Sequence, residues 1–407
     1  MVQEILSGGG ILLTVGVLLI TGYLLGSFAR LLGFPRVSGY VLAGVLLSPS
    51  LLGVVDGEFL KDAHIITHAS LSVITFLIGS SLSLKKIKSM GKSVVAITLG
   101  EAEFAFLAVS LVMMFYLSLT LNLPVSELVS VALLMGALAS PTDPSSTLAV
   151  IHESKAKGPL TDTVLGVTAL DDATGILNFS IAFAVADTLL SGGQLNLLKT
   201  LYSSAVTILG AVALGVVAGI VMYILGELAR TKKEVVTLTF GTLFITFSTA
   251  RALGFDELLA TMSVGVVIAN LGKAWEKFEK PLENYVEDLI FTAFFVVGSA
   301  FLNLSVLLSS TALILVYVLS RFAGKWLGVQ TGGVLSNASP EVRDNIAFAL
   351  FPQGGIVIGL ALMVNSNLDL HELGSVLVSL VIGAVVVQEF LGPVLSKMAL
   401  HRAGEIK

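Results

Sequence analysis

The chain has 407 residues, of which 55% are hydrophobic and only 13% are charged, with a net charge of −5 and no cysteine. Soluble proteins carry about 25% charged residues, so the composition excludes an ordinary soluble domain. The lack of cysteine excludes disulfides and thiolate metal sites. Apolar runs long enough to cross about 30 Å of hydrocarbon recur along the whole chain, which predicts an all-α polytopic membrane protein.

The apolar segments, taken in chain order, predict thirteen transmembrane helices. The N-terminal sequence MVQEILSGGG lacks the basic region of a cleavable signal peptide, so the first apolar segment is expected to remain as a span. The expected spans are residues 10–29, 37–55, 64–83, 94–120, 127–150, 161–187, 197–226, 234–253, 256–272, 285–302, 305–329, 342–364 and 372–396.

Lysine and arginine residues gather in the loops that follow the odd-numbered spans. These are Arg30, Arg36, Lys85, Lys86, Lys88, Lys92, Lys155, Lys157, Arg230, Lys232, Lys233, Lys273, Lys277, Lys280, Arg343, Lys397, Arg402 and Lys407. The even-numbered spans are followed only by Lys61, Lys199 and Arg251. Because cytoplasmic loops are rich in lysine and arginine, the N-terminus is expected outside and the C-terminus in the cytoplasm.

Three stretches of the first half recur in the second half, in the same order and at nearly the same spacing. The pairs are AGVLLS (43–48) with VGVVIAN (264–270), FLIGSSLSL (76–84) with FFVVGSAFLNL (294–304), and SPTDPSS (140–146) with FPQGG (351–355). Spans 2–6 then match spans 9–13, and an offset of seven spans inverts the second half in the membrane. Two inverted-topology repeats, each with a broken helix, indicate a secondary transporter.

The two breaks fall inside apolar spans. They contain Pro141, Thr142, Asp143 and Pro144 in the fifth span, and Pro352, Gly354 and Gly355 in the twelfth. Proline removes a backbone donor, and unwound backbone is tolerated at membrane depth only where protein or a cavity surrounds it. The freed helix ends carry partial charges that could hold an ion. A simple packing kink in each helix is the alternative.

Charged residues inside the spans are costly and therefore mark functional sites. The acids are Glu101 and Glu103 in span 4, Asp143 in span 5, and Asp171 and Asp172 in span 6; the bases are Arg321 and Lys325 in span 11. Adjacent helix residues differ by about 100°, so one aspartate of the pair can face an ion cavity while the other reaches a partner such as Lys325.

Oxygen ligands for a cation can be placed around the second aspartate of the pair. Thr168 lies one turn before Asp172, and Asp143 and the freed carbonyl of Thr142 could add oxygens from the break. Carboxylate, carbonyl and hydroxyl oxygens suit a hard cation such as Na⁺, with Asp172 and Asp143 as its charged ligands. A buried carboxylate can hold a proton or a cation but not readily both, which is the chemistry of antiport.

Structural readings remain open for several of these charges. Asp171 and Lys325 could form a purely structural ion pair. Glu101 and Glu103 are expected near the cytoplasmic interface, in an accessory structural or gating role. Arg321 could cap helix ends, or it could replace Lys325 as the partner of Asp171.

The sequence resembles the monovalent cation/proton antiporter superfamily, and specifically its electrogenic branch, over essentially the whole chain. The resemblance rests on TDP (142–144), the paired Asp171 and Asp172, and GKWLG (324–328) in family order. It implies that Asp172 binds the cation and exchanges protons, that Asp171 pairs with Lys325 and exchanges it for a proton, and that Asp143 offsets the helix ends. If Arg321 pairs with Asp171 instead, one proton carrier is lost.

The resemblance also implies the sodium/proton antiporter fold, a homodimer and exchange of two protons for one Na⁺ by an elevator motion. The dimerisation domain would be residues 1–92 and 234–304, the core ion-transport domain 93–190 and 305–400, and the linker helix 191–233. No cofactor and no nucleic acid are implied; the partners are monovalent cations, protons and the lipid bilayer. The location implied is the plasma (inner) membrane of a prokaryote.

Other functions remain as alternatives. Within the same class these are a K⁺/H⁺ antiporter, Li⁺ transport and an electroneutral Na⁺/H⁺ exchanger. A sodium-coupled organic-anion transporter is the competitor from another class. An intramembrane aspartyl protease and a passive cation channel are disfavoured, because the protease motifs are absent and no ring of charges is evident.

Overall fold

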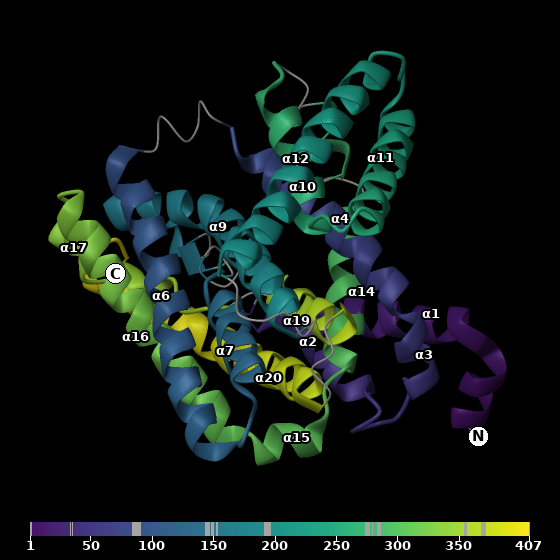
Figure 1. The fold of residues 1–407 in the computed structure, drawn as a ribbon, viewed down its shortest axis with the longest axis horizontal. Helices are drawn as coiled ribbons and strands as arrows, with labels where there is room; N and C mark the ends of the chain where they lie inside the picture. The colour runs from purple at the N-terminus through teal and green to yellow at the C-terminus, as the bar shows by residue number, and fades with distance from the viewer. Residues whose placement is uncertain are drawn as a thin grey trace.

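The computed structural model describes residues 2–32, 34, 36–83, 91–142, 147, 150–151, 154–190, 197–272, 277–278, 280–282, 286–353, 356–367 and 372–406. Every regular element in these ranges is a helix, as the composition predicts. In Figure 1, α1 and the N-terminus lie at one end of the molecule, and α6, α16 and the C-terminus lie at the opposite end.

Helices occur at all thirteen predicted spans. In chain order they are α1 (Val2–Leu31), α2 (Arg36–Leu47), α3 (Gly57–Asp62), α4 (His64–Ser81), α6 (Gly91–Thr120), α7 (Val125–Ala139), α9 (Pro159–Leu190), α10 (Leu197–Gly226), α11 (Lys232–Ala252), α12 (Glu257–Asn270), α14 (Glu287–Ala300), α15 (Leu304–Ser309), α16 (Thr311–Leu335), α17 (Pro340–Arg343), α18 (Ile346–Ala349), α19 (Ile356–Asn367) and α20 (Glu372–Arg402). The short helix α3 lies between predicted spans, whereas α15 falls at the start of the predicted span 305–329 and α17 overlaps the start of the predicted span 342–364.

Not every helix is long enough to cross a membrane alone. Among the described residues, 7 helices are long and apolar enough, and a bent pair, Gly374–Gln388 with Leu391–Arg402, makes up to 8. Four further apolar helices are only 10–17 residues long. Hydropathy overestimated the span 37–55, because α2 ends before Pro49.

Both expected helix breaks are present. The first helix ends at Ala139, Pro141 and Thr142 are non-helical, and the chain is helical again at residues 147, 150 and 151. In the second half, α18 ends at Ala349, residues 351–353 are non-helical, and α19 begins at Ile356. Four residues predicted to belong to these breaks lie outside the described residues, namely Asp143, Pro144, Gly354 and Gly355.

The repeat is visible in how helices from the two halves pack. Gly44 of AGVLLS lies against the backbone carbonyl of Val296, so that α2 packs on α14. Gly265 of VGVVIAN, its counterpart in the second half, lies against the backbone carbonyl of Phe76, so that α12 packs on α4. The two corresponding helices, α2 and α12, therefore each pack on a helix of the other half through a corresponding glycine, as an internal repeat requires.

A stripe of glycines brings α6 and α16 into backbone contact. Gly324, Gly328 and Gly332 lie four residues apart on one face of α16. A Cβ atom at Gly328 would collide with the backbone of Gly100 on α6, and one at Gly100 would collide with the backbone of Gly328. Small residues of this kind let membrane helices approach closely. This approach places Glu101 of α6 beside the charged residues of α16.

Candidate functional site

Lys325 lies in the middle of α16 and is completely buried. Its ammonium donates to the carbonyl oxygen of Ser140 at 2.8 Å and to the hydroxyl of Thr142 at 2.8 Å, both in the first helix break. Its third hydrogen bond goes to a carboxylate oxygen of Glu101 on α6. An ammonium has three donors, so these three acceptors occupy all of them.

Asp171 faces the same ammonium from α9 but does not share a hydrogen bond with it. Its Oδ2 lies 3.9 Å from Lys325 Nζ, and both side chains are fully buried. Neither carboxylate oxygen of Asp171 accepts a hydrogen bond from the part of the chain that the structure describes. Asp171 and Lys325 therefore approach each other as opposite charges but without a hydrogen bond. Lys325, and not Arg321, is the base next to Asp171.

Glu101 is placed differently from the expectation. The sequence predicted a position near the cytoplasmic interface, but the side chain is completely buried and forms an ion pair with Lys325. The glycine contact between α6 and α16 explains the difference, because it brings the Glu101 carboxylate within reach of an ammonium 224 residues away. Glu103 lies on another face of α6 and is partly exposed.

Arg321, one helical turn before Lys325, connects the two broken helices. It donates to the carbonyls of Ala139 (2.9 Å) and Pro141 (2.8 Å) in the first break, and of Phe351 (2.7 Å) and Pro352 (3.3 Å) in the second. These oxygens lie at or just after the C-terminal ends of α7 and α18, where the helix dipoles are negative. Arg321 thus caps helix ends, one of the two roles that the sequence left open.

Two glutamines complete this junction, and the sequence analysis did not select either of them. Gln388 of α20 accepts from Arg321 Nη1 at 2.7 Å and donates to Gln353 at 2.7 Å. Gln353 in turn donates to the carbonyl of Leu138 at 2.6 Å and to the hydroxyl of Tyr317 at 2.8 Å. A lone glutamine inside an apolar span, as at Gln388, was the signal that could have identified the network.

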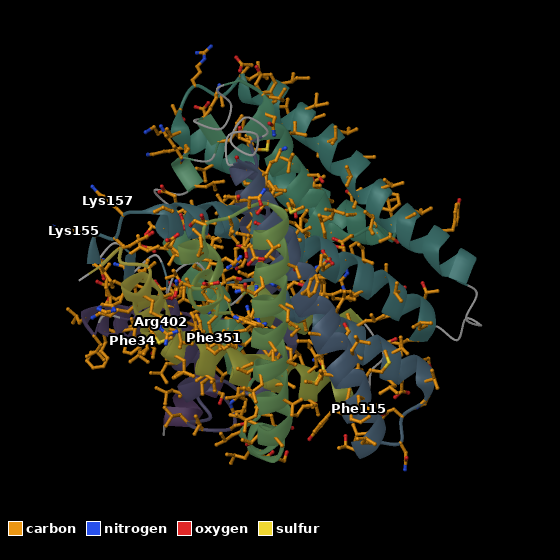
Figure 2. The ribbon with its side chains drawn as sticks, turned by 90° about the vertical axis from the view of Figure 1, so that its left-hand side faces the viewer. Phe34, Phe115, Lys155, Lys157, Phe351 and Arg402 are labelled. Atoms are coloured by element: carbon orange, nitrogen blue, oxygen red, sulfur yellow. The ribbon has the colours of Figure 1, made fainter. Side chains whose placement is uncertain are left out.

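The break also has a polar link to α9 and α6. Asn178 of α9 donates to the hydroxyl of Ser140 at 3.1 Å, and that hydroxyl donates to the carbonyl of Ala102 at 3.2 Å. Phe351 of the second break packs its ring on Phe322 of α16, with centroids 5.7 Å apart, and lies inside the molecule beside α16 (Figure 2). Both breaks are therefore fixed to the helices that carry the charges.

The second aspartate of the pair occupies a different environment from the first. Asp172 is partly exposed, while Asp171 is fully buried, as expected for adjacent residues that point apart. Thr168, one turn earlier, is buried and donates its hydroxyl to the carbonyl of Val164 at 2.9 Å, which leaves its oxygen able to accept a bond or bind a cation. The ligand expected from the break was the carbonyl oxygen of Thr142. In the structure, the hydroxyl of Thr142 accepts a hydrogen bond from Lys325.

The structure therefore brings together Thr142, Asp171, Lys325, Arg321 and Glu101 around Pro141 and Pro352. The place of Asp143, the other expected Na⁺ ligand, lies outside the described residues. Within the described ranges, no cluster of three His, Cys, Asp or Glu side chains could hold a resident metal ion. The site offers oxygen atoms and titratable carboxylates around one lysine, which suits exchange of a small cation.

Comparison with known proteins shows which family the chain matches. Residues 16–398 match the family described as sodium/hydrogen exchanger, transmembrane. The Na(+)/H(+) antiporter NhaP of Pseudomonas aeruginosa is 24% identical over 249 residues, which cover 54% of this chain and 56% of that protein. The Na(+)/H(+) antiporter NhaS4 of Synechocystis is 23% identical over 324 residues, covering 74% of this chain and 78% of that protein.

A solved structure shows the same fold. The sodium proton antiporter MjNhaP1 from Methanocaldococcus jannaschii, at pH 8, superposes with a TM-score of 0.74 at 20% sequence identity. The superposition covers 98% of this chain and 99% of that chain. At this identity the match establishes the arrangement of helices but not the ion that is transported.

Proposed function

Because the chain belongs to the sodium/hydrogen exchanger family, we propose that it is a secondary active antiporter that exchanges a monovalent cation for protons. Na⁺ is the preferred cation in this proposal, since the curated relatives are both called Na(+)/H(+) antiporters. The chain is an integral membrane protein by its family and its apolar helices. The proposed location is the plasma membrane of a prokaryote.

The observation that carries the proposal is the buried pair of Asp171 and Lys325 between two broken helices. Unwound backbone at membrane depth supplies carbonyl oxygens, and the carboxylates of Asp171 and Asp172 supply charge. Asp172, which is partly exposed, would take the cation or a proton first, with Thr168 and Thr142 as neutral ligands. The two species compete for the same carboxylates, so release of one accompanies binding of the other.

The stoichiometry depends on which base faces Asp171. Lysine can lose its proton in a buried site, whereas arginine stays charged. The Lys325 ammonium lies near Asp171, and Arg321 gives its donors to carbonyl and amide oxygens. This favours two protons exchanged for one Na⁺, an electrogenic cycle.

Electroneutral exchange is the second candidate, and one observation favours it. Lys325 forms an ion pair with Glu101 in addition to its approach to Asp171. The Glu101 carboxylate already balances the charge of this ammonium, so the lysine need not exchange a proton during the cycle. If the lysine never deprotonates, one cation moves against one proton and the membrane potential has no effect.

An elevator motion is proposed for alternating access. The site is built from α6, the break after α7, α9, α16, the break before α19, and α20, so these elements must move as one body. They lie in the core domain proposed for residues 93–190 and 305–400. The dimerisation domain of a homodimer would be residues 1–92 and 234–304, joined through the linker 191–233.

The orientation proposed from the basic loops requires these loops to share one side of the molecule. In Figure 2, Lys155, Lys157 and Arg402 lie on the same side of the molecule, while Phe115 lies toward the opposite side. The lysines follow the fifth span and the arginine follows the thirteenth, so both loops would face the cytoplasm. The N-terminus would then lie outside.

Proton flux in proteoliposomes tests the function. Na⁺ or K⁺ is added to vesicles that hold the wild type or Asp172→Asn, with and without a clamped membrane potential. Sodium-driven proton movement that responds to potential and disappears in Asp172→Asn supports electrogenic Na⁺/H⁺ exchange. Exchange that ignores the potential supports the electroneutral cycle, and the absence of proton movement with either cation contradicts the proposal.

A further inference from the structure

We propose that Glu101 is a positioning residue for cation binding: it anchors the Lys325 ammonium and keeps it from closing onto Asp171. This inference rests on the proposed function, because it concerns how the exchange site stays open to a cation. The hydrogen bond and ion pair of the Glu101 carboxylate go to Lys325, and the same carboxylate also lies close to that of Asp171. Its effect on the cation would pass through the position of that ammonium.

The donor geometry of the lysine is the first support. The three N–H groups of Lys325 are directed at Glu101, Ser140 and Thr142, so none remains for Asp171. Asp171 Oδ2 lies 3.9 Å away, beyond hydrogen-bond distance, although it is fully buried and charged when deprotonated. The lysine could reach it only by giving up one of its three present acceptors.

The distance to be crossed is small. A charge-assisted hydrogen bond from ammonium to carboxylate spans about 2.8 Å, so a shift of about 1 Å would convert the present approach into a full ion pair. Of the three acceptors, Glu101 is the only one with a charge. Its carboxylate is therefore the group that balances the attraction of Asp171 for the ammonium, and its removal would release the lysine toward α9.

Other charges near the lysine do not take over this role. Arg321, one turn away on α16, gives five hydrogen bonds to the backbone of the two breaks and to Gln388. Glu103, two residues beyond Glu101 on α6, lies on a different face and is partly exposed. Glu101 Oε1 and both oxygens of Asp171 accept no hydrogen bond within the described ranges, so a displaced ammonium has an acceptor ready on α9.

The consequence for transport is a change in cation affinity. When the ammonium closes onto Asp171, a cation must displace it in order to use that carboxylate. Glu101→Gln should therefore raise the KM for Na⁺ about tenfold while the maximal rate stays within about twofold of the wild type, because the substitution weakens Na⁺ binding and not the later steps of the cycle. Glu101→Asp, which keeps the charge, should stay within about threefold of the wild-type KM.

A double variant separates this role from direct ligation of the cation. In Glu101→Gln/Lys325→Gln no ammonium is left to compete for Asp171, and the glutamine at 325 can still donate to Ser140 and Thr142. The double variant should therefore bind Na⁺ with a KM within about threefold of the wild type, despite the high KM of Glu101→Gln. Glu103→Gln is the matched control on the same helix and should match the wild type.

The experiment measures both Na⁺-driven proton flux in proteoliposomes and Na⁺ binding to purified full-length protein by calorimetry. A high KM and weak binding in Glu101→Gln, restored in the double variant, support the inference. A high KM in both variants would mean that Glu101 is itself a cation ligand. An unchanged KM in Glu101→Gln would mean that its role is only structural. Either result overturns the inference. If Glu101→Gln does not fold, Glu101→Ala takes its place in both the single and the double variant, with the same criteria.

Failure of the proposed function would look different. If the wild type exchanges no cation for protons, or if Asp172→Asn exchanges as well as the wild type, the antiporter proposal fails. If the wild type exchanges and Asp172→Asn does not, but Glu101→Gln binds Na⁺ as the wild type does, only the role of Glu101 fails.

Discussion

Arg321 and Gln388 form a buried hydrogen bond of 2.7 Å that ties α16 to α20 at the point where the two broken helices meet. The same guanidinium binds carbonyl oxygens from both breaks, and Gln388 passes the connection on to Gln353. One arginine thus compensates the exposed backbone of two helix ends that the bilayer alone could not satisfy.

Removal of this arginine should destabilise the protein. Arg321→Gln leaves carbonyl oxygens of both breaks buried without a donor, at a cost of more than about 3 kcal/mol. We expect a clear fall of the thermal midpoint in detergent, followed by intrinsic fluorescence. Arg343→Gln is the control, because Arg343 is partly exposed and its ion pair with Asp344 lies at the surface; it should change stability by less than about 0.5 kcal/mol. An Arg321→Gln protein as stable as the wild type would contradict the capping role.

Loss of the lysine should change the response to voltage and leave exchange intact. In Lys325→Gln the cycle has no ammonium that can give up a proton, so cation exchange should continue but should no longer respond to an imposed potential. The measurement is Na⁺-driven proton flux at a series of clamped potentials. Lys397→Gln, at an exposed position of α20, should keep the wild-type response. A voltage response in Lys325→Gln equal to that of the wild type would exclude the lysine as a proton carrier.

The close approach of α6 and α16 should be essential for stability. A side chain at Gly328 meets the backbone of Gly100 and Glu101, which cannot move aside as a flexible side chain could. We expect Gly328→Val to cost about 3 kcal/mol and to separate Glu101 from Lys325. Thermal unfolding and Na⁺ exchange both report the change.

A matched glycine provides the control for that substitution. No atom lies within 4 Å of the place that a Cβ would occupy at Gly241, in the interior of α11. Gly241→Ala should therefore leave exchange unchanged and stabilise the helix by up to about 1 kcal/mol. If Gly328→Val unfolds no earlier than Gly241→Ala, the contact between α6 and α16 does not hold the site.

The parts of the fold that depend on local chemistry could be predicted from the sequence. Pro141 and Pro352 mark the breaks because proline removes a helix donor wherever it stands. The internal repeat was visible because AGVLLS and VGVVIAN keep a small residue at the same packing point, Gly44 and Gly265. The lengths of the helices were less predictable, since hydropathy continues across the points where prolines end them.

The partners within the site depend on contacts that sequence distance hides. Glu101 reaches Lys325 only because glycines on two helices let the backbones touch, 224 residues apart in the chain. Gln353 and Gln388 are 35 residues apart in the chain, and the hydrogen-bond network between them forms only because Arg321 lies between the two breaks. The sequence identifies which charged residues lie inside the apolar spans, and the packing of the helices determines which of them come into contact.

If one site holds either a cation or protons, binding of the cation must release protons, and this release can be measured. Na⁺ is added to purified protein in weakly buffered solution, and the change in pH is followed for the wild type, Asp172→Asn and the control Asp162→Asn, which is exposed in the first turn of α9. We expect proton release that saturates with Na⁺ in the wild type and in Asp162→Asn, and none in Asp172→Asn. Equal release from Asp172→Asn, or Na⁺ binding to the wild type without release, would contradict this expectation.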